Sequence, residues 1–67
     1  MNIEYIKKAF QEGMKIQLIR MKGEPQMPFG LIGTVVAVDD IGQVHMKWEN
    51  GSSLALDTGV DSFKVIS

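Results

Sequence analysis

Two adjacent carboxylates and one histidine are the side chains that most directly suggest chemistry in this sequence, namely Asp39, Asp40 and His45. Paired carboxylates can carry out acid–base catalysis or hold a metal, and glycoside hydrolysis needs two of them across a cleft. Aspartates between two strands also favour turns, because they hydrogen bond their own backbone. We expect this structural role for both aspartates. Because His45 alternates with apolar residues, we expect it on an exposed strand face, without a catalytic or ligand role.

Other kinds of reactive site lack their usual residues. The chain has no cysteine and one histidine, which excludes thiolate ligands, cysteine nucleophiles and multi-histidine zinc sites within one chain. Ser52 and Ser53 have no sequence neighbour that would activate them as nucleophiles. The segment 30–33 begins and ends with glycine but lacks the lysine and the following helix of a phosphate-binding loop. We therefore predict that the protein is not an enzyme and uses no cofactor or metal.

Length and composition indicate a single small globular domain over residues 1–67. A chain of 67 residues buries only about 60% of the surface that its unfolded form exposes, so we expect marginal stability. Its hydrophobic content of 45% is too high for a disordered protein. Its formal net charge of −1 gives it no overall attraction for nucleic acid. No apolar run approaches the roughly 20 residues that span a bilayer, and no signal-peptide pattern opens the chain. We therefore expect a cytoplasmic protein with no membrane partner.

The N-terminal segment has helical periodicity. Ile3, Ile6 and Phe10 recur three and four residues apart, which predicts an amphipathic helix over residues 2–12 whose apolar side packs on the rest of the domain. Asn2 is the expected N-cap, and Gly13 is expected to end the helix in a left-handed conformation.

After residue 13 the period changes to two, as in half-buried strands. We expect five strands, over residues 14–18, 31–38, 43–48, 53–56 and 63–66. A loop over residues 22–30 separates the first two strands. Asn50-Gly51 predicts a type I′ hairpin turn between the third and fourth. So few residues can bury one face of each strand only if the sheet curls on itself. The expected fold is therefore mainly β: a five-stranded SH3-like small barrel over residues 13–66, with the short N-terminal α-helix.

Several motifs in the strand region resemble a family of small bacterial and mobile-element proteins catalogued as domain of unknown function 4314. These are GMKIQLIRM at 13–21, GLIGTV at 30–35, VDDIG at 38–42, WENGSSL at 48–54 and DSF at 61–63. The resemblance covers about residues 13–66 and departs at 22–25, where an aspartate-rich loop is expected. This family has no established activity, so the resemblance implies a fold and transfers no function.

A more distant likeness is to KOW-type and other SH3-like modules, which share a Gly-x-Val-x-x-Val strand at positions matching 33–38. Such a strand bends sharply, with Gly33 permitting the bend and with Val35 and Val38 reaching the core across a bulge. Modules of this type bind RNA, ribosomes, peptides or other proteins. This is an analogy of fold and carries little weight for function.

The loop over residues 22–30 is the candidate partner-binding segment, because loops on rigid scaffolds often carry binding function. Its apolar residues are Met27, Pro28 and Phe29, and we expect Trp48 beneath or beside them. The alternative is that the loop closes one end of the barrel and that Trp48 anchors the core. The leading hypothesis is a non-catalytic module that binds a protein or peptide.

Two other functions are compatible with the sequence. A nucleic-acid-binding accessory domain would use Lys15, Arg20, Lys22 and Lys47, although the net charge does not favour it. A structural module would form homodimers through the helix or an edge strand, because small barrels leave short strand edges that proteins cover or pair.

Overall fold

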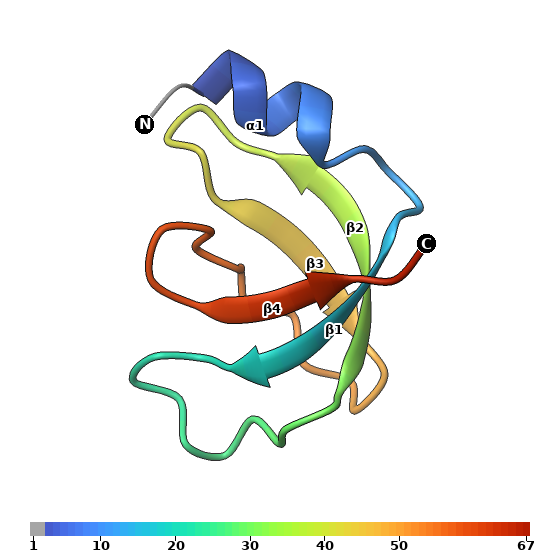
Figure 1. The fold of residues 1–67 in the computed structure, drawn as a ribbon, viewed down its shortest axis with the longest axis vertical. Coiled ribbons are helices and arrows are strands. Elements are labelled where there is room, and N and C mark those ends of the chain that lie inside the picture. The colour runs from blue at the N-terminus through green and yellow to red at the C-terminus, as the bar shows by residue number, and fades with distance from the viewer. Residues whose placement is uncertain (1–2) are drawn as a thin grey trace.

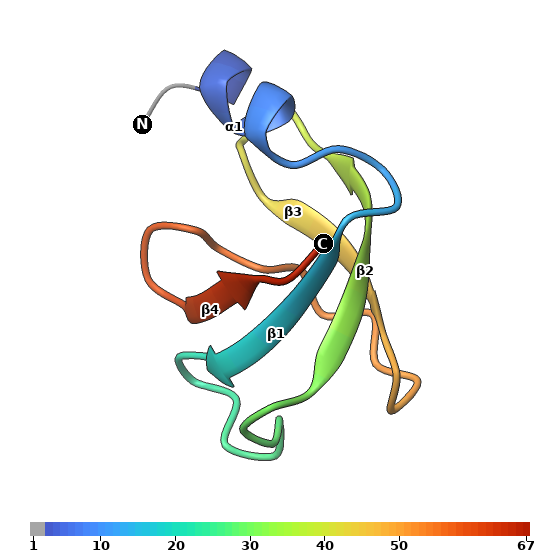
Figure 2. The same cartoon turned by 45° about the vertical axis from the view of Figure 1, so that its right-hand side comes forward.

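The computed structural model describes residues 3–67 as one short helix and one curled antiparallel sheet (Figures 1 and 2). The elements are α1 Ile3–Ala9, β1 Lys15–Arg20, β2 Ile32–Val38, β3 Val44–Trp48 and β4 Ser62–Val65. The strand order is β3-β2-β1-β4, so the last strand returns to pair with the first. The prediction of a mainly β chain with an N-terminal helix is confirmed. Asn2, the expected N-cap, lies outside the described residues.

The predicted closed five-stranded barrel is wrong, because the described residues form an open sheet of four strands. The expected strand over 53–56 is reduced to a single bridge between Val44 and Leu56. Both backbone groups of Leu54 are bound elsewhere: its carbonyl accepts the Trp48 indole N–H at 2.9 Å, and its N–H donates to Ser52 Oγ at 3.2 Å. Side chains therefore take the hydrogen bonds that a regular ladder beside β3 would use.

The core lies on the inner face of the curled sheet. Alternation along β3 buries Val44, Met46 and Trp48 and exposes His45 and Lys47, and the exposure of His45 confirms its prediction. The fully buried residues also include members of β1, β2 and the segment after β3. Within residues 3–67 the buried hydrophobic residues are Ile6, Ile16, Leu18, Met21, Met27, Val35, Val44, Met46, Trp48 and Leu56. One apolar side chain from the helix therefore completes a core made mostly by strands.

Helix α1 is shorter than predicted and lies across the end of the sheet near the β2–β3 turn (Figure 1). Its buried residue, Ile6, reaches Gly42 in that turn, whose Cβ position would be 3.3 Å from Ile6 Cδ1. Phe10 packs edge-on against Phe63, with ring centroids 5.7 Å apart. The helix ends at Ala9, so Gly13 does not cap it. Gly13 instead takes a φ of 91° in the turn that leads into β1.

The Asn50-Gly51 hairpin forms, but its turn is not type I′. That type needs positive φ at both central residues, and among the described residues only glycines have positive φ, Gly51 at 87°. Gly51 N–H donates to the Trp48 carbonyl at 3.0 Å, and Trp48 N–H donates to the Ser52 carbonyl at 3.0 Å. This is a three-residue connection that ends in a left-handed glycine.

Replacing Gly51 with valine should lower the free energy of unfolding by about 1–2 kcal/mol, because a β-branched residue is strained at positive φ. No atom lies within 4 Å of the position that its Cβ would take, so backbone strain is the expected cause. Urea unfolding measures the loss. Gly51→Asn is the matched control, since asparagine tolerates the left-handed region better. Equal midpoints for the valine and asparagine variants would contradict this account of the turn.

Candidate functional site

The 22–30 loop is built from consecutive hydrogen-bonded turns at the end of the sheet opposite α1 (Figures 1 and 2). Glu24 N–H donates to the Met21 carbonyl at 3.2 Å, and Met27 N–H donates to the Glu24 carbonyl at 3.0 Å. A third turn joins Leu31 N–H to the Pro28 carbonyl at 3.3 Å. The loop has no regular secondary structure, yet three turns, each closed by a hydrogen bond between residues three apart, hold its backbone.

Buried methionines and one backbone contact fix this loop to the sheet. Met21 and Met27 belong to the core, and Asn50 Nδ2 approaches the Met27 sulfur at 3.8 Å from the neighbouring hairpin. Gly30 N–H donates to the Leu18 carbonyl of β1 at 2.7 Å. The loop is thus anchored near both of its ends and in its middle.

Phe29 is the most exposed large apolar residue of the described chain, with 80% of its surface accessible. It follows Pro28 and precedes Gly30, whose φ of 88° lets the chain turn back toward β1. Pro28 is also exposed, whereas Met27 is only 6% exposed. The apolar surface expected from residues 27–29 therefore consists of Pro28 and Phe29, and Met27 lies beneath it.

Trp48 is a core residue in the structure, with 2% of its surface accessible. Its ring packs over Gly33 of the neighbouring strand, and its indole N–H is satisfied by the Leu54 carbonyl. Of the two roles that the sequence leaves open for Trp48, the observed burial matches the core anchor. Its side chain is not part of the surface around Phe29.

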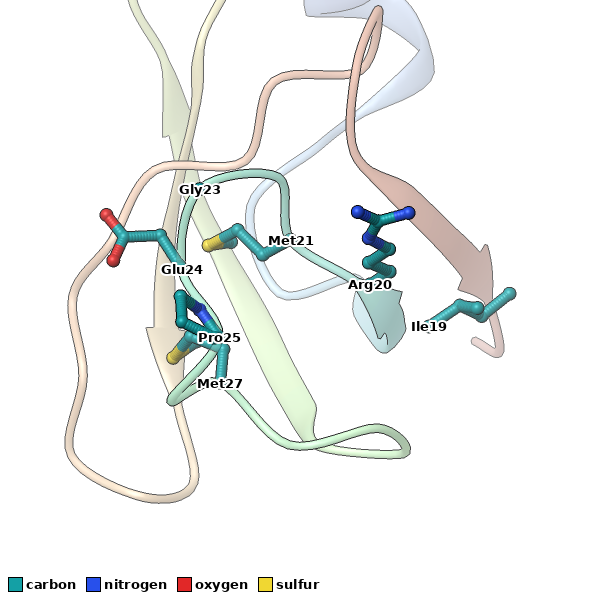
Figure 3. A pocket seen from close by; sticks show the side chains of 7 residues that line it. All are labelled: Ile19, Arg20, Met21, Gly23, Glu24, Pro25 and Met27. Atoms are coloured by element: carbon teal, nitrogen blue, oxygen red, sulfur yellow. The ribbon is translucent and has the colours of Figure 1, made fainter.

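A pocket of about 300 Å³ lies where β1 enters the loop (Figure 3). It is lined by Ile19, Arg20, Met21, Gly23, Glu24, Pro25 and Met27. In Figure 3 the Glu24 carboxylate points away from Arg20. The sequence pattern did not single out Ile19 or Pro25, and no local signal marks them, because the pocket forms only when the loop folds back on the end of β1.

The four basic residues considered for nucleic acid fall into two groups. Lys15 and Lys47 share the outer face of the sheet, since both pair with Thr34 in register, and Lys15 Nζ lies 2.6 Å from Thr34 Oγ1. Arg20 and Lys22 lie at the other end of β1. There the Asp61 carboxylate accepts the Lys22 backbone N–H at 3.0 Å. The set does not form one continuous basic surface.

Asp39 organises the β2–β3 turn, which is the structural role expected of it. Its Oδ1 accepts the N–H groups of Ile41 and Gln43 at 3.1 and 2.9 Å, and its Oδ2 lies 2.8 Å from His45 Nε2. Asp40 instead contacts Lys7 Nζ of the helix at 3.2 Å. Partial removal from water raises the pKa of Asp39, but the hydrogen bonds from Gln43, His45 and Ile41 outweigh it and lower that pKa overall.

Stability should therefore fall in acid partly through Asp39. A lowered folded-state pKa means that the Asp39 contribution is complete above the unfolded pKa and is lost as the pH drops through the folded pKa. Urea midpoints at about pH 7 and about pH 3 should differ less for Asp39→Asn than for the unaltered chain. Asp40→Asn is the control, because it alters the neighbouring carboxylate and leaves the hydrogen bonds of Asp39 in place. An unchanged pH dependence in Asp39→Asn would contradict this prediction.

Within residues 3–67, no three histidine, aspartate or glutamate side chains are grouped so that they could hold a metal ion. No helix of the same segment is long and apolar enough to cross a membrane.

The chain was compared with protein families, curated proteins and solved structures, and one family matches nearly its full length. No curated protein and no solved structure gives a significant match. A family model described as Domain of unknown function (DUF4314) matches residues 1–66 and so includes the helix, the sheet and the 22–30 loop. This match confirms the resemblance carried by the strand motifs. The chain belongs to the DUF4314 family.

Proposed function

We propose that this chain is a non-catalytic interaction module that binds a protein or peptide partner through its 22–30 loop. The observation that carries the proposal is the exposure of Phe29, at 80%, on a loop whose one methionine, Met27, is buried. An exposed aromatic side chain supplies a large contact area and orders only two side-chain torsions when it binds. The three turns and the Gly30–Leu18 hydrogen bond supply a rigid support for it.

The arrangement of the loop favours binding over a purely structural role. If the loop only closed the end of the sheet, its largest apolar side chain, Phe29, would be expected to face the core. Met27 is the side chain that does so. Phe29 is turned outward in the hydrogen-bonded turn between Pro28 and Leu31, and the same loop also lines a pocket through Gly23, Glu24, Pro25 and Met27. A pre-ordered loop also lowers the entropic cost of association.

The strand order supports a finer description of the fold. We infer an open variant of the SH3-like arrangement, in which three consecutive antiparallel strands are followed by a last strand that returns to the first. The segment that bridges β3 at Leu56 takes the place of the missing strand. This inference supports a binding module by analogy of fold and does not identify the partner.

Phe29→Ala tests the proposed function in one variant. Its urea midpoint should stay close to that of the unaltered chain, because exposed substitutions usually change stability by less than about 0.5 kcal/mol. Capture of a specific partner from cells of the native host, quantified by mass spectrometry, should fall by about tenfold or more, as for an aromatic hot spot.

Ile41→Ala is the matched control, because Ile41 is similarly exposed, at 76%, but lies in the β2–β3 turn. Proteins lost with Phe29→Ala and retained with Ile41→Ala are the specific partners. Equal capture profiles for the two variants would refute the proposal. A loss of about 3–5 kcal/mol in Phe29→Ala would show that this ring is a core residue instead.

A further inference from the structure

Arg20 is a cation without an internal partner at the edge of the loop pocket. Its guanidinium forms no hydrogen bond or ion pair with any of residues 3–67. Glu24 accepts a hydrogen bond from Gln26 Nε2 at 2.6 Å, and its carboxylate faces away from Arg20 (Figure 3). Asp61 uses its two oxygens on the backbone N–H groups of Lys22 and Asp57. The planar fork of Arg20 is therefore available to a carboxylate from outside, which it can bind through two parallel hydrogen bonds.

Besides Arg20, the pocket is lined by Gly23, by Glu24 and by four apolar side chains. Met21 and Met27 are buried side chains that reach the pocket from the core, and Ile19 and Pro25 complete the apolar lining. Methionine side chains are flexible and polarisable, so such a wall adapts to aliphatic groups of different shape. A volume of about 300 Å³ lies at the lower limit for ligand sites and fits a side chain of a peptide better than a cofactor.

We propose that this pocket selects the partner, and that it takes an acidic residue next to an aliphatic residue in an extended peptide. This inference rests on the proposed function of the loop. The carboxylate binds Arg20, and the aliphatic side chain enters between Met21 and Met27. Phe29 follows Met27 by two residues, which is about 7 Å of chain. In this proposal the same peptide continues past the pocket to meet Phe29.

The test is a titration of the full chain, carrying 13C-labelled methionine methyl groups, with the capped dipeptide N-acetyl-Glu-Leu-amide. We expect the methyl signals of Met21 and Met27 to shift and to saturate with a dissociation constant on the order of 1 mM. N-acetyl-Gln-Leu-amide has the same shape without the charge and should bind about tenfold or more weakly. Arg20→Gln should weaken binding of the acidic dipeptide to the same extent. Lys64→Gln, which removes an exposed cation from β4, should leave it unchanged.

Three results would overturn the inference. Absence of methyl shifts with the acidic dipeptide would remove the pocket as a binding site. Equal binding of the acidic and neutral dipeptides would remove Arg20 from recognition. Tighter binding of N-acetyl-leucine, which carries a terminal carboxylate, would identify a chain end as the occupant.

The two proposals fail in different ways. If Phe29→Ala loses the captured partner while Arg20→Gln retains it, the loop binds a partner and the pocket does not select it. If the dipeptide binds as expected but Phe29→Ala captures the same proteins as Ile41→Ala, the pocket is real and the proposed function of the loop is wrong.

Discussion

Trp48→Ala is expected to leave most molecules unfolded at room temperature. The ring is 2% exposed and belongs to the core, so its loss removes a large apolar area and leaves a cavity. Truncation of a buried aromatic residue costs about 3–5 kcal/mol. A domain of this size has only about 3–5 kcal/mol of stability in total. The far-ultraviolet circular dichroism of the variant should therefore resemble that of the urea-unfolded chain.

A conservative variant separates the two contributions of this side chain. Trp48→Phe keeps much of the apolar area but removes the indole N–H that donates to the Leu54 carbonyl. The Leu54 carbonyl then lacks its hydrogen-bond partner, which costs about 1–3 kcal/mol of stability. This cost adds to that of the lost apolar area, which is smaller than in Trp48→Ala. Trp48→Phe should thus remain folded with a clearly lowered urea midpoint. A folded Trp48→Ala variant of nearly native stability would mean that the ring is not a core residue.

Much of the fold follows from periodicity alone. Alternating apolar residues locate the strands, because one face of each must be buried and the other is solvated. The same pattern places Val44, Met46 and Trp48 on one face of a strand and His45 on the other, and the structure buries the first three and exposes His45. Three- and four-residue spacing likewise places Ile3, Ile6 and Phe10 on the packed side of the helix, and of these three only Ile6 is fully buried.

The missing fifth strand could not be foreseen from residue types, because its cause is a contact between segments. Leu54 and Leu56 are spaced two residues apart, as apolar residues are in a half-buried strand, and Leu56 does pair with Val44. Regular pairing stops where the Trp48 indole takes the Leu54 carbonyl. Whether a tryptophan N–H finds a backbone partner depends on the tertiary position of the ring.

The candidate site was only partly predictable for a related reason. Proline and glycine mark the 22–30 loop, and an aromatic residue beside proline marks Phe29 as a surface candidate. The pattern does not distinguish Met27, which is buried, from Phe29, which is exposed. That difference arises from the turns between Met21 and Leu31, whose hydrogen bonds set which side chain faces the core.

Gly33→Ala should destabilise the domain by about 1–3 kcal/mol, as overpacking of a core does. A Cβ built on Gly33 would lie 2.8 Å from Cδ2 and Cζ3 of the Trp48 ring, and closer still to Cε3. The ring cannot easily retreat, because it is buried and its N–H is held by Leu54. The sequence assigns Gly33 to a strand bend. In the structure the register shift lies further along, between Val35 and Ala37, and Gly33 makes room for the ring.

The sign of this effect is diagnostic. Gly33 does not have positive φ, so alanine can adopt its backbone conformation without strain. In the absence of a steric contact, glycine-to-alanine changes of this kind stabilise by about 0.4–1 kcal/mol, because they restrict the unfolded chain. Urea midpoints for Gly33→Ala, Trp48→Phe and the double variant complete a cycle. Gly33→Ala should lower the free energy of unfolding less in the Trp48→Phe background, because the smaller ring leaves space for the added methyl group. If the two substitutions have additive effects instead, contact with Trp48 is not the cause of the destabilisation.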